Sequence, residues 1–308
     1  MSSPRRVILR EVGPRDGLQA EAPVAVDVRV ALVEGLLAAG VRHVEVASFV
    51  SPKAVPAMAG AAEVVAAVGR PAGVVRTALV PNRRGAELAL DAGVDELTVT
   101  VSASETYSQK NVHMSTEESL AATASVCALA STGTPDAVLS FAFGSPYEGD
   151  LPPEEVATFA ARLVDGGATT ITLADTTGMA TPRRIDEALE ALTAGDAGDV
   201  LVFGGGPIGL HLHETRGTGL LNLYAGFQRG VARFDTSVGG LGGSPFAAGA
   251  GGNVATEDAV ALLDDLGVET GIDLDRLLIV SADLERAIGR PVPSRVAHAG
   301  PRTRRAEG

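Results

Sequence analysis

The stretch VILREVGPRDGLQ, residues 7–19, separates two candidate folds. Its first half is apolar and rich in β-branched residues, which predicts a strand, and its second half predicts the turn that follows. A doubly wound open sheet normally carries a glycine-rich dinucleotide-binding turn after its first strand. Because GPRDGLQ is not such a turn, the open sheet is only the second-best interpretation.

Strand-like runs alternate with helix-like stretches along the rest of the chain. The strand-like runs lie at 7–13, 41–49, 74–80, 96–103, 137–143, 169–176, 208–214 and 233–240, and clear helix-like stretches lie at 28–40, 115–130, 152–167 and 181–192. Several of these helices begin with Ser, Thr, Asp or Pro and end with Gly. Eight strand–helix repeats predict an α/β fold of the (β/α)8 TIM-barrel type, with an extra C-terminal helix at 274–289.

Composition and charge narrow the function classes. The chain has 308 residues, of which 45% are hydrophobic and 20% charged, as in an ordinary globular protein. We expect one domain over residues 1–308, with a frayed tail over about 299–308.

No apolar run is long enough for a transmembrane helix and no signal peptide is recognised, so a cytoplasmic protein is expected. The net charge of −13 argues against nucleic acid or a membrane surface as partner. The single cysteine, Cys127, excludes an internal disulfide, and its helical spacing predicts a core position.

Polar residues gather where the predicted strands end, which is where barrel enzymes place their active sites. His211 and His213 share one side of the seventh strand, because side chains alternate along a strand. Two imidazoles with a carboxylate across the barrel would form a nitrogen and oxygen site for a divalent cation. The alternative is one hydrogen-bonded core histidine beside an exposed one. The glycine-rich loop 239–253 predicts either a tight connection or a mobile flap.

Several long motifs resemble one family. EVGPRDGLQ (11–19), VEVASFVSPKAVPAM (44–58), HLHET (211–215) and GGLGGSPFAAGAGGNVATED (239–258) are similar to 3-hydroxy-3-methylglutaryl-CoA (HMG-CoA) lyase. SETYSQKNV (104–112), GSPYEG (144–149) and LADTTGMATP (173–182) extend the match over nearly the whole chain. The resemblance implies a divalent-cation-dependent retro-Claisen cleavage of a β-hydroxyacyl-CoA. The products would be acetyl-CoA and an oxo acid, which is acetoacetate when the substrate is HMG-CoA.

The resemblance also assigns roles to residues. It implies Mg²⁺ or Mn²⁺ as cofactor, with four ligands: Asp16, His211, His213 and Asn253. Arg15 would polarise the substrate and stabilise the enolate, since its guanidinium is always charged. Glu45 and Asp175 match acidic positions near the reacting centre. Substrate contacts or scaffold roles would fall on Gln19, Ser48, Lys53 and Asn111. An acyl-CoA is the expected partner molecule, and a homodimer is the candidate assembly.

One position departs from the family pattern. The loop of the family normally reads Gly-Gly-Cys-Pro with a catalytic cysteine, and here Ser244 stands at that place. A serine hydroxyl is a poorer proton shuttle than a thiol. The chain is therefore an HMG-CoA lyase with another proton path, a lyase for a related thioester such as citramalyl-CoA or a longer 3-hydroxy-3-alkylglutaryl-CoA, or a weakly active acyl-CoA-binding paralogue.

Further classes also use paired histidines, among them the metal-dependent 2-oxo-acid aldolases, whereas the loop 239–253 looks like the lyase form. Isopropylmalate and homocitrate synthases normally append a domain for which this chain is too short. An iron oxygenase with two histidines and one carboxylate is possible on ligand types alone, but the match at Asn253 counts against it.

Overall fold

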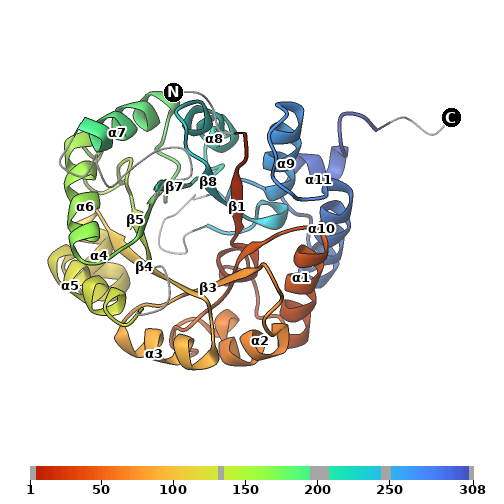
Figure 1. Ribbon diagram of the computed structural model, residues 1–308, viewed down its shortest axis with the longest axis horizontal. Coiled ribbons are helices and arrows are strands. Elements are labelled where there is room, and N and C mark those ends of the chain that lie inside the picture. The colour runs from red at the N-terminus through yellow and green to blue at the C-terminus, as the bar shows by residue number, and fades with distance from the viewer. Residues whose placement is uncertain (1–4, 131–134, 195–207, 244–250, 305–308) are drawn as a thin grey trace.

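The structure, a computed structural model, describes residues 5–130, 135–194, 208–243 and 251–304. Eight parallel strands in these ranges pair in chain order, and the last pairs with the first, so that they close a barrel (Figure 1). This confirms the predicted (β/α)8 fold. The strands are β1 (Ile8–Glu11), β2 (His43–Ser48), β3 (Val75–Leu79), β4 (Glu96–Ser102), β5 (Pro135–Ser140), β6 (Thr170–Ala174), β7 (Ile208–His211) and β8 (Arg233–Thr236).

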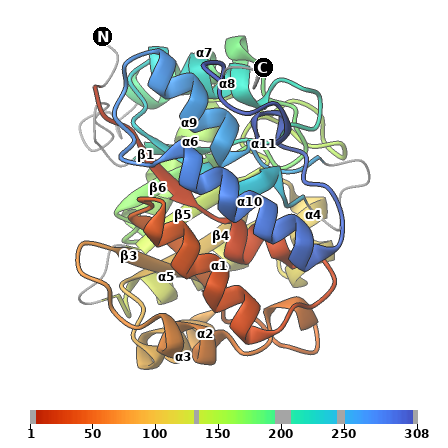
Figure 2. The same cartoon turned by 90° about the vertical axis from the view of Figure 1, so that its right-hand side faces the viewer.

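Helices surround the barrel and cover the strands with their apolar sides (Figure 1). The helices are α1 (Val26–Ala38), α2 (Ala61–Val68), α3 (Arg83–Ala92), α4 (Glu105–Val112), α5 (Thr116–Cys127), α6 (Pro153–Asp165), α7 (Pro182–Ala194), α8 (Gly219–Gln228), α9 (Thr256–Asp265), α10 (Leu274–Ile288) and α11 (Arg295–Ala299). The predicted C-terminal helix is α10, which lies beside α1 (Figure 2). At the expected start of α5, Ser115 and Glu118 form a capping box. Cys127 is buried, as expected.

The predicted strand 7–13 ends two residues early, and the turn after it carries Arg15 and Asp16. The strand ends at Glu11, and Gly13–Gly17 form one turn of π-helix. Pro14 has no N–H with which to continue a strand ladder. The N–H groups of Arg15, Asp16 and Gly17 all point to the carbonyl of Val12, at 3.1, 2.7 and 3.2 Å. This single turn therefore fixes Arg15 and Asp16 together.

The π-helical turn packs tightly against the segment that follows β8. A Cβ on Gly17 would lie 2.8 Å from the Oγ of Ser237 and 3.2 Å from the Cβ of Leu241. Any side chain there would push the turn away from that segment. The glycine thus keeps the end of β1 close to the end of β8, the two strands that close the barrel.

The interior of the barrel contains charged side chains as well as apolar ones. Arg10 on β1, Asp136 on β5, and Arg233 and Asp235 on β8 are all buried. Arg10 Nη1 lies 2.6 Å from Asp136 Oδ2, and Arg233 Nη2 lies 3.1 Å from the same oxygen. Because buried charges must be paired, the two arginines and two aspartates balance one another across the barrel.

The expectations on domain organisation stay predictions. Near the C-terminal end, Arg302 forms an ion pair with Asp265, and residues 305–308 lie outside the described ranges. Among the described residues, no helix is both long and apolar enough to cross a membrane.

Candidate functional site

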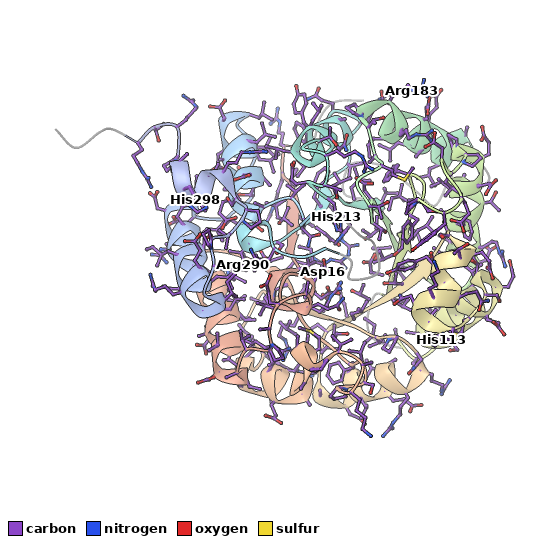
Figure 3. The ribbon with its side chains drawn as sticks, turned by 180° about the vertical axis from the view of Figure 1, so that it is seen from behind. Asp16, His113, Arg183, His213, Arg290 and His298 are labelled. Atoms are coloured by element: carbon purple, nitrogen blue, oxygen red, sulfur yellow. The ribbon has the colours of Figure 1, made fainter. Side chains whose placement is uncertain are left out.

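Asp16, His211 and His213 meet at the end of the barrel where β1 and β7 finish. One ligand atom from each lies within 4.8 Å of the other two. The Nε2 atoms of the two histidines are 3.1 Å apart, and His211 Nε2 is 3.9 Å from Asp16 Oδ2. Figure 3 shows Asp16 and His213 near the middle of the barrel, whereas His113 and His298 lie at its periphery. The structure thus brings three of the four expected ligands to one point.

Asn253, the fourth expected ligand, belongs to the same cluster. It forms an antiparallel bridge with His213, and its Nδ2 donates hydrogen bonds to Asp16 Oδ2 at 2.8 Å and to the carbonyl of Leu241 at 2.9 Å. Its Oδ1 is buried without a hydrogen-bond partner. A buried amide oxygen without a partner is costly unless something else satisfies it.

Arg15 lies beside these residues and is held by two carboxylates. Its Nε donates to Glu45 Oε2 at 2.5 Å, and its Nη1 donates to Asp16 Oδ1 at 2.6 Å. Glu45 comes from β2 and is fully buried, so it fixes the direction of the guanidinium. One oxygen of Asp16 therefore faces Arg15, and the other faces Asn253 and the histidines.

Asp175 follows β6 directly and borders the cluster. Its backbone N–H donates to the carbonyl of His211 at 2.8 Å, and its Oδ1 accepts from the N–H of Ala180 at 2.9 Å. Oδ2 is buried without a hydrogen-bond partner. Burial raises the pKa of Asp175 to about 6. Asp175 therefore keeps one buried carboxylate oxygen without a partner, and its backbone is bonded to that of His211.

The electrostatics of the cluster suit a cation. Burial acts to raise the pKa of Asp16, but the charges of Arg15 and His211 outweigh it and lower that pKa below its usual value. Burial and the neighbouring His211 lower the pKa of His213 to about 4, so this ring is neutral near pH 7. Asp16 and His213 are thus in the protonation states in which carboxylates and imidazoles bind metals. Burial acts to lower the pKa of His211, but the hydrogen bond and charge of Asp235 outweigh it and raise that pKa, so a cation would have to displace a proton from this ring.

The residues present fit a divalent cation. Two imidazoles, one carboxylate and one amide oxygen form a mixed donor set of the kind that first-row divalent ions accept. The unpartnered Oδ1 of Asn253 would gain the partner that it lacks. Asp16, His211 and His213 therefore form a candidate site for a divalent cation.

The other expected site residues are more dispersed. Ser48 ends β2 and is buried, and its Oγ has no hydrogen-bond partner. Gln19 is partly buried after the π-helical turn, whereas Lys53 after β2 and Asn111 on α4 are exposed. Ser244 lies outside the described residues. The roles of these five residues stay predictions.

The structure also reveals a contact that sequence reasoning missed. Asp235 Oδ2 lies 3.1 Å from Nδ1 of His211, on the side of the ring away from His213. The available signal was a charged residue inside a short strand, in RFDT (233–236). A polar residue in a strand faces either water or the interior, and the pattern does not decide which until the strand register is known.

Comparisons with known proteins identify the family of the chain. The model of the HMGL-like family matches residues 6–284. This chain belongs to the HMGL-like family. A hydroxymethylglutaryl-CoA lyase of Bacillus subtilis is 42% identical over 96% of this chain and 97% of its own length. An (R)-citramalyl-CoA lyase of Chloroflexus aurantiacus is also 42% identical, over 96% of this chain and 95% of its own length.

A solved HMGL-like structure supports the fold over almost the entire chain. An HMG-CoA lyase from Acinetobacter baumannii, in complex with coenzyme A and 3-methylmalate, superposes with a TM-score of 0.92 at 36% identity and covers 98% of each chain. The barrel, and the family to which it belongs, therefore agree with the resemblance noted in the motifs. Two relatives that are named as lyases of different CoA thioesters are therefore equally similar in sequence to this chain.

Proposed function

We propose that this chain is a divalent-cation-dependent carbon–carbon lyase that cleaves HMG-CoA to acetyl-CoA and acetoacetate. The observation that carries the proposal is the meeting of Asp16, His211 and His213 with the unpartnered Oδ1 of Asn253. A bound Mg²⁺ or Mn²⁺ would lower the pKa of the substrate hydroxyl and fix its geometry. Membership of a lyase family supports the reaction class.

Arg15 is suited to the charge that develops during cleavage. When the bond between the carbinol carbon and the CoA-bound methylene breaks, its electron pair moves into a thioester enolate. A permanently charged guanidinium beside the cluster stabilises this anion, and Glu45 holds it in place. The fixed direction of Arg15 means that no reorganisation is needed when the charge appears.

Two proton transfers complete the balance of the reaction. The hydroxyl of the substrate loses a proton to a base, and the carbon of the enolate gains one, from that protonated base or from solvent water, to give acetyl-CoA. We propose that Asp175, whose Oδ2 is buried without a hydrogen-bond partner, accepts the hydroxyl proton. Ser244 stands where the family places its cysteine, so we propose that it positions a hydrogen bond and does not act as an acid.

A lyase acting on citramalyl-CoA is the second candidate function. It is favoured by the relative named (R)-citramalyl-CoA lyase, whose identity to this chain equals that of the HMG-CoA lyase. The same cleavage of citramalyl-CoA would release pyruvate in place of acetoacetate. The residues that we propose for catalysis serve both substrates, so substrate choice depends on the groups around the acyl chain.

One assay separates these functions. The purified protein is incubated with HMG-CoA or with each isomer of citramalyl-CoA, with and without added Mg²⁺ or Mn²⁺, and acetyl-CoA, acetoacetate and pyruvate are measured. Cation-dependent acetoacetate release supports the first proposal, and pyruvate release supports the second. Binding of acyl-CoA without product from either thioester would identify the weakly active paralogue and contradict both.

Location and assembly are also proposals. We propose a cytoplasmic location, and a homodimer as the assembly in solution. Light scattering on the purified protein tests the assembly, because a mass near that of one 31.2 kDa chain would contradict it. Fractionation of the source cells tests the location.

A further inference from the structure

Asp235 connects the candidate metal centre to the charged interior of the barrel. His211, Asp235 and Arg10 are register partners on the adjacent strands β7, β8 and β1. The Oδ2 of Asp235 lies 3.1 Å from His211 Nδ1 and 2.6 Å from Arg10 Nη2. The exposed fractions of Arg10 and Asp235 are 1% and 3%, so water does not compete for these contacts.

Arg10 donates two hydrogen bonds to the carboxylate of Asp235. Its Nε donates to Oδ1 at 2.7 Å and its Nη2 donates to Oδ2 at 2.6 Å, which is the fork geometry of a strong arginine–carboxylate pair. Its Nη1 reaches across the barrel to Asp136 at 2.6 Å. The two hydrogen bonds from Arg10 therefore fix the carboxylate plane of Asp235, whose Oδ2 also contacts His211.

A carboxylate held in this way determines which nitrogen of His211 carries a proton. An ionised carboxylate only accepts hydrogen bonds, so Nδ1 of His211 must be the protonated nitrogen. Cation binding requires the neutral imidazole, and in that form Nε2, the atom that faces His213 and Asp16, presents its lone pair to the cluster. Carboxylates that bind the far nitrogen of a metal-ligating histidine orient the ring and raise its basicity.

We propose that Asp235, held by Arg10, is a positioning residue that fixes the ring and the tautomer of His211 for cation binding. The inference rests on the proposed function, because it takes His211 as a ligand. It adds two residues that the family resemblance did not bring into the site. Neither residue touches the substrate or the cation in this proposal, and both act through His211.

The first experiment determines by NMR which ring nitrogen of His211 carries the proton. Long-range ¹H–¹⁵N spectra of the wild-type protein resolve its five histidines, and the signals of His211 are assigned from their loss in His211→Gln. The expected result, at a pH where the ring of His211 is neutral, is a protonated Nδ1 and an unprotonated Nε2. A bare Nδ1 would overturn the inference. Since this experiment uses the wild-type chain without added cation, it does not depend on any variant at Asp235 folding or on the proposed function.

The second experiment measures Mn²⁺ affinity. Asp235→Asn removes the charge and keeps the shape, and loss of such a partner typically weakens metal binding about 10- to 100-fold. Asp95→Asn is the matched control, because Arg76 grips Asp95 through Nε and Nη2 in the same fork but no histidine contacts it in the described structure. Its Mn²⁺ affinity should stay within about twofold of wild type. Circular dichroism establishes that both variants are folded.

The outcomes distinguish the two proposals. If the wild-type protein binds Mn²⁺ and the Asp235→Asn variant binds it equally well, the inference is overturned. The proposed function is unaffected by that result. Wild-type protein that binds no Mn²⁺ would overturn the proposed function, and the proton on Nδ1 would still decide the role of Asp235. Equal losses in Asp235→Asn and Asp95→Asn would indicate a general effect of removing a carboxylate from an arginine and would also contradict the inference.

Discussion

Arg15 Nε lies 2.5 Å from Oε2 of Glu45, and both side chains are buried at the mouth of the barrel. The pair joins the turn after β1 to β2. A buried guanidinium needs a partner, and Glu45 supplies one without occupying every donor of Arg15. The contact therefore sets the direction of the positive charge and leaves part of it available for a substrate.

Arg15→Lys should reduce kcat strongly even though the charge is kept. A lysine ammonium cannot donate in the fork geometry that Arg15 uses toward Glu45 and Asp16. Loss of a preorganised donor to a developing anion costs about 3–4 kcal/mol, or a hundredfold or more in rate. Steady-state kinetics against Arg83→Lys, an exposed change on α3, measures the effect. A kcat within threefold of wild type would rule out this role for Arg15.

Asp16→Ala and His213→Ala should each abolish cation-dependent cleavage while the barrel still folds. Each change removes one of three converging ligand atoms. Acetyl-CoA release and Mn²⁺ binding are the measurements, and His298→Ala, at the periphery of the barrel, is the control (Figure 3). Activity of the wild-type enzyme that survives exhaustive chelation would contradict the prediction.

Ser244→Cys should raise the rate of HMG-CoA cleavage if proton transfer limits turnover. A thiol has an unperturbed pKa of about 8.5 and forms its anion far more readily than a serine hydroxyl. The rates of HMG-CoA and citramalyl-CoA cleavage by both proteins provide the comparison. An unchanged or lower rate with HMG-CoA would show that the serine is adapted to the chemistry of this chain.

Glu257→Gln should increase stability at alkaline pH. Burial, with a smaller contribution from the charge of Glu11, raises the pKa of Glu257 to about 8. Because the folded pKa lies above the unfolded value, the protonated carboxyl stabilises the fold, and this stabilisation is lost as pH rises from about 4.5 through 8. The loss amounts to a few kcal/mol, since one pKa unit corresponds to about 1.4 kcal/mol.

Thermal unfolding at pH 5 and pH 9 measures this effect. Wild-type protein should lose more of its Tm between these values than Glu257→Gln does. Glu87→Gln, on the exposed side of α3, should behave like wild type. If the Tm of the wild-type protein falls between pH 5 and pH 9 by no more than that of Glu257→Gln, the pKa of Glu257 is not raised and the prediction is wrong.

The sequence predicted the architecture because strand and helix periodicities alternate regularly, and glycine and capping residues mark the ends of helices such as α5. Alternation along β7 placed His211 and His213 on one side, where the structure has them. The one-turn π-helix that carries Arg15 and Asp16 has no comparable periodicity, so its geometry was not foreseen.

The charged interior could not be predicted in the same way. Arg10 on β1 contacts Asp136 on β5, 126 positions further along the chain. Such a contact depends on barrel closure and strand register, which local patterns do not contain. For the same reason the link from Asp235 to His211 became visible only with the three strands in place.

Pairing Arg10 and Arg233 with Asp136 and Asp235 has an evolutionary consequence. Replacing any one of these four with a neutral residue leaves an excess charge in a medium that solvates it poorly, at a cost of about 3–5 kcal/mol. A lineage can exchange this salt network for apolar packing only through compensating double substitutions. Descendants of this barrel are thus expected to show those positions changing in concert.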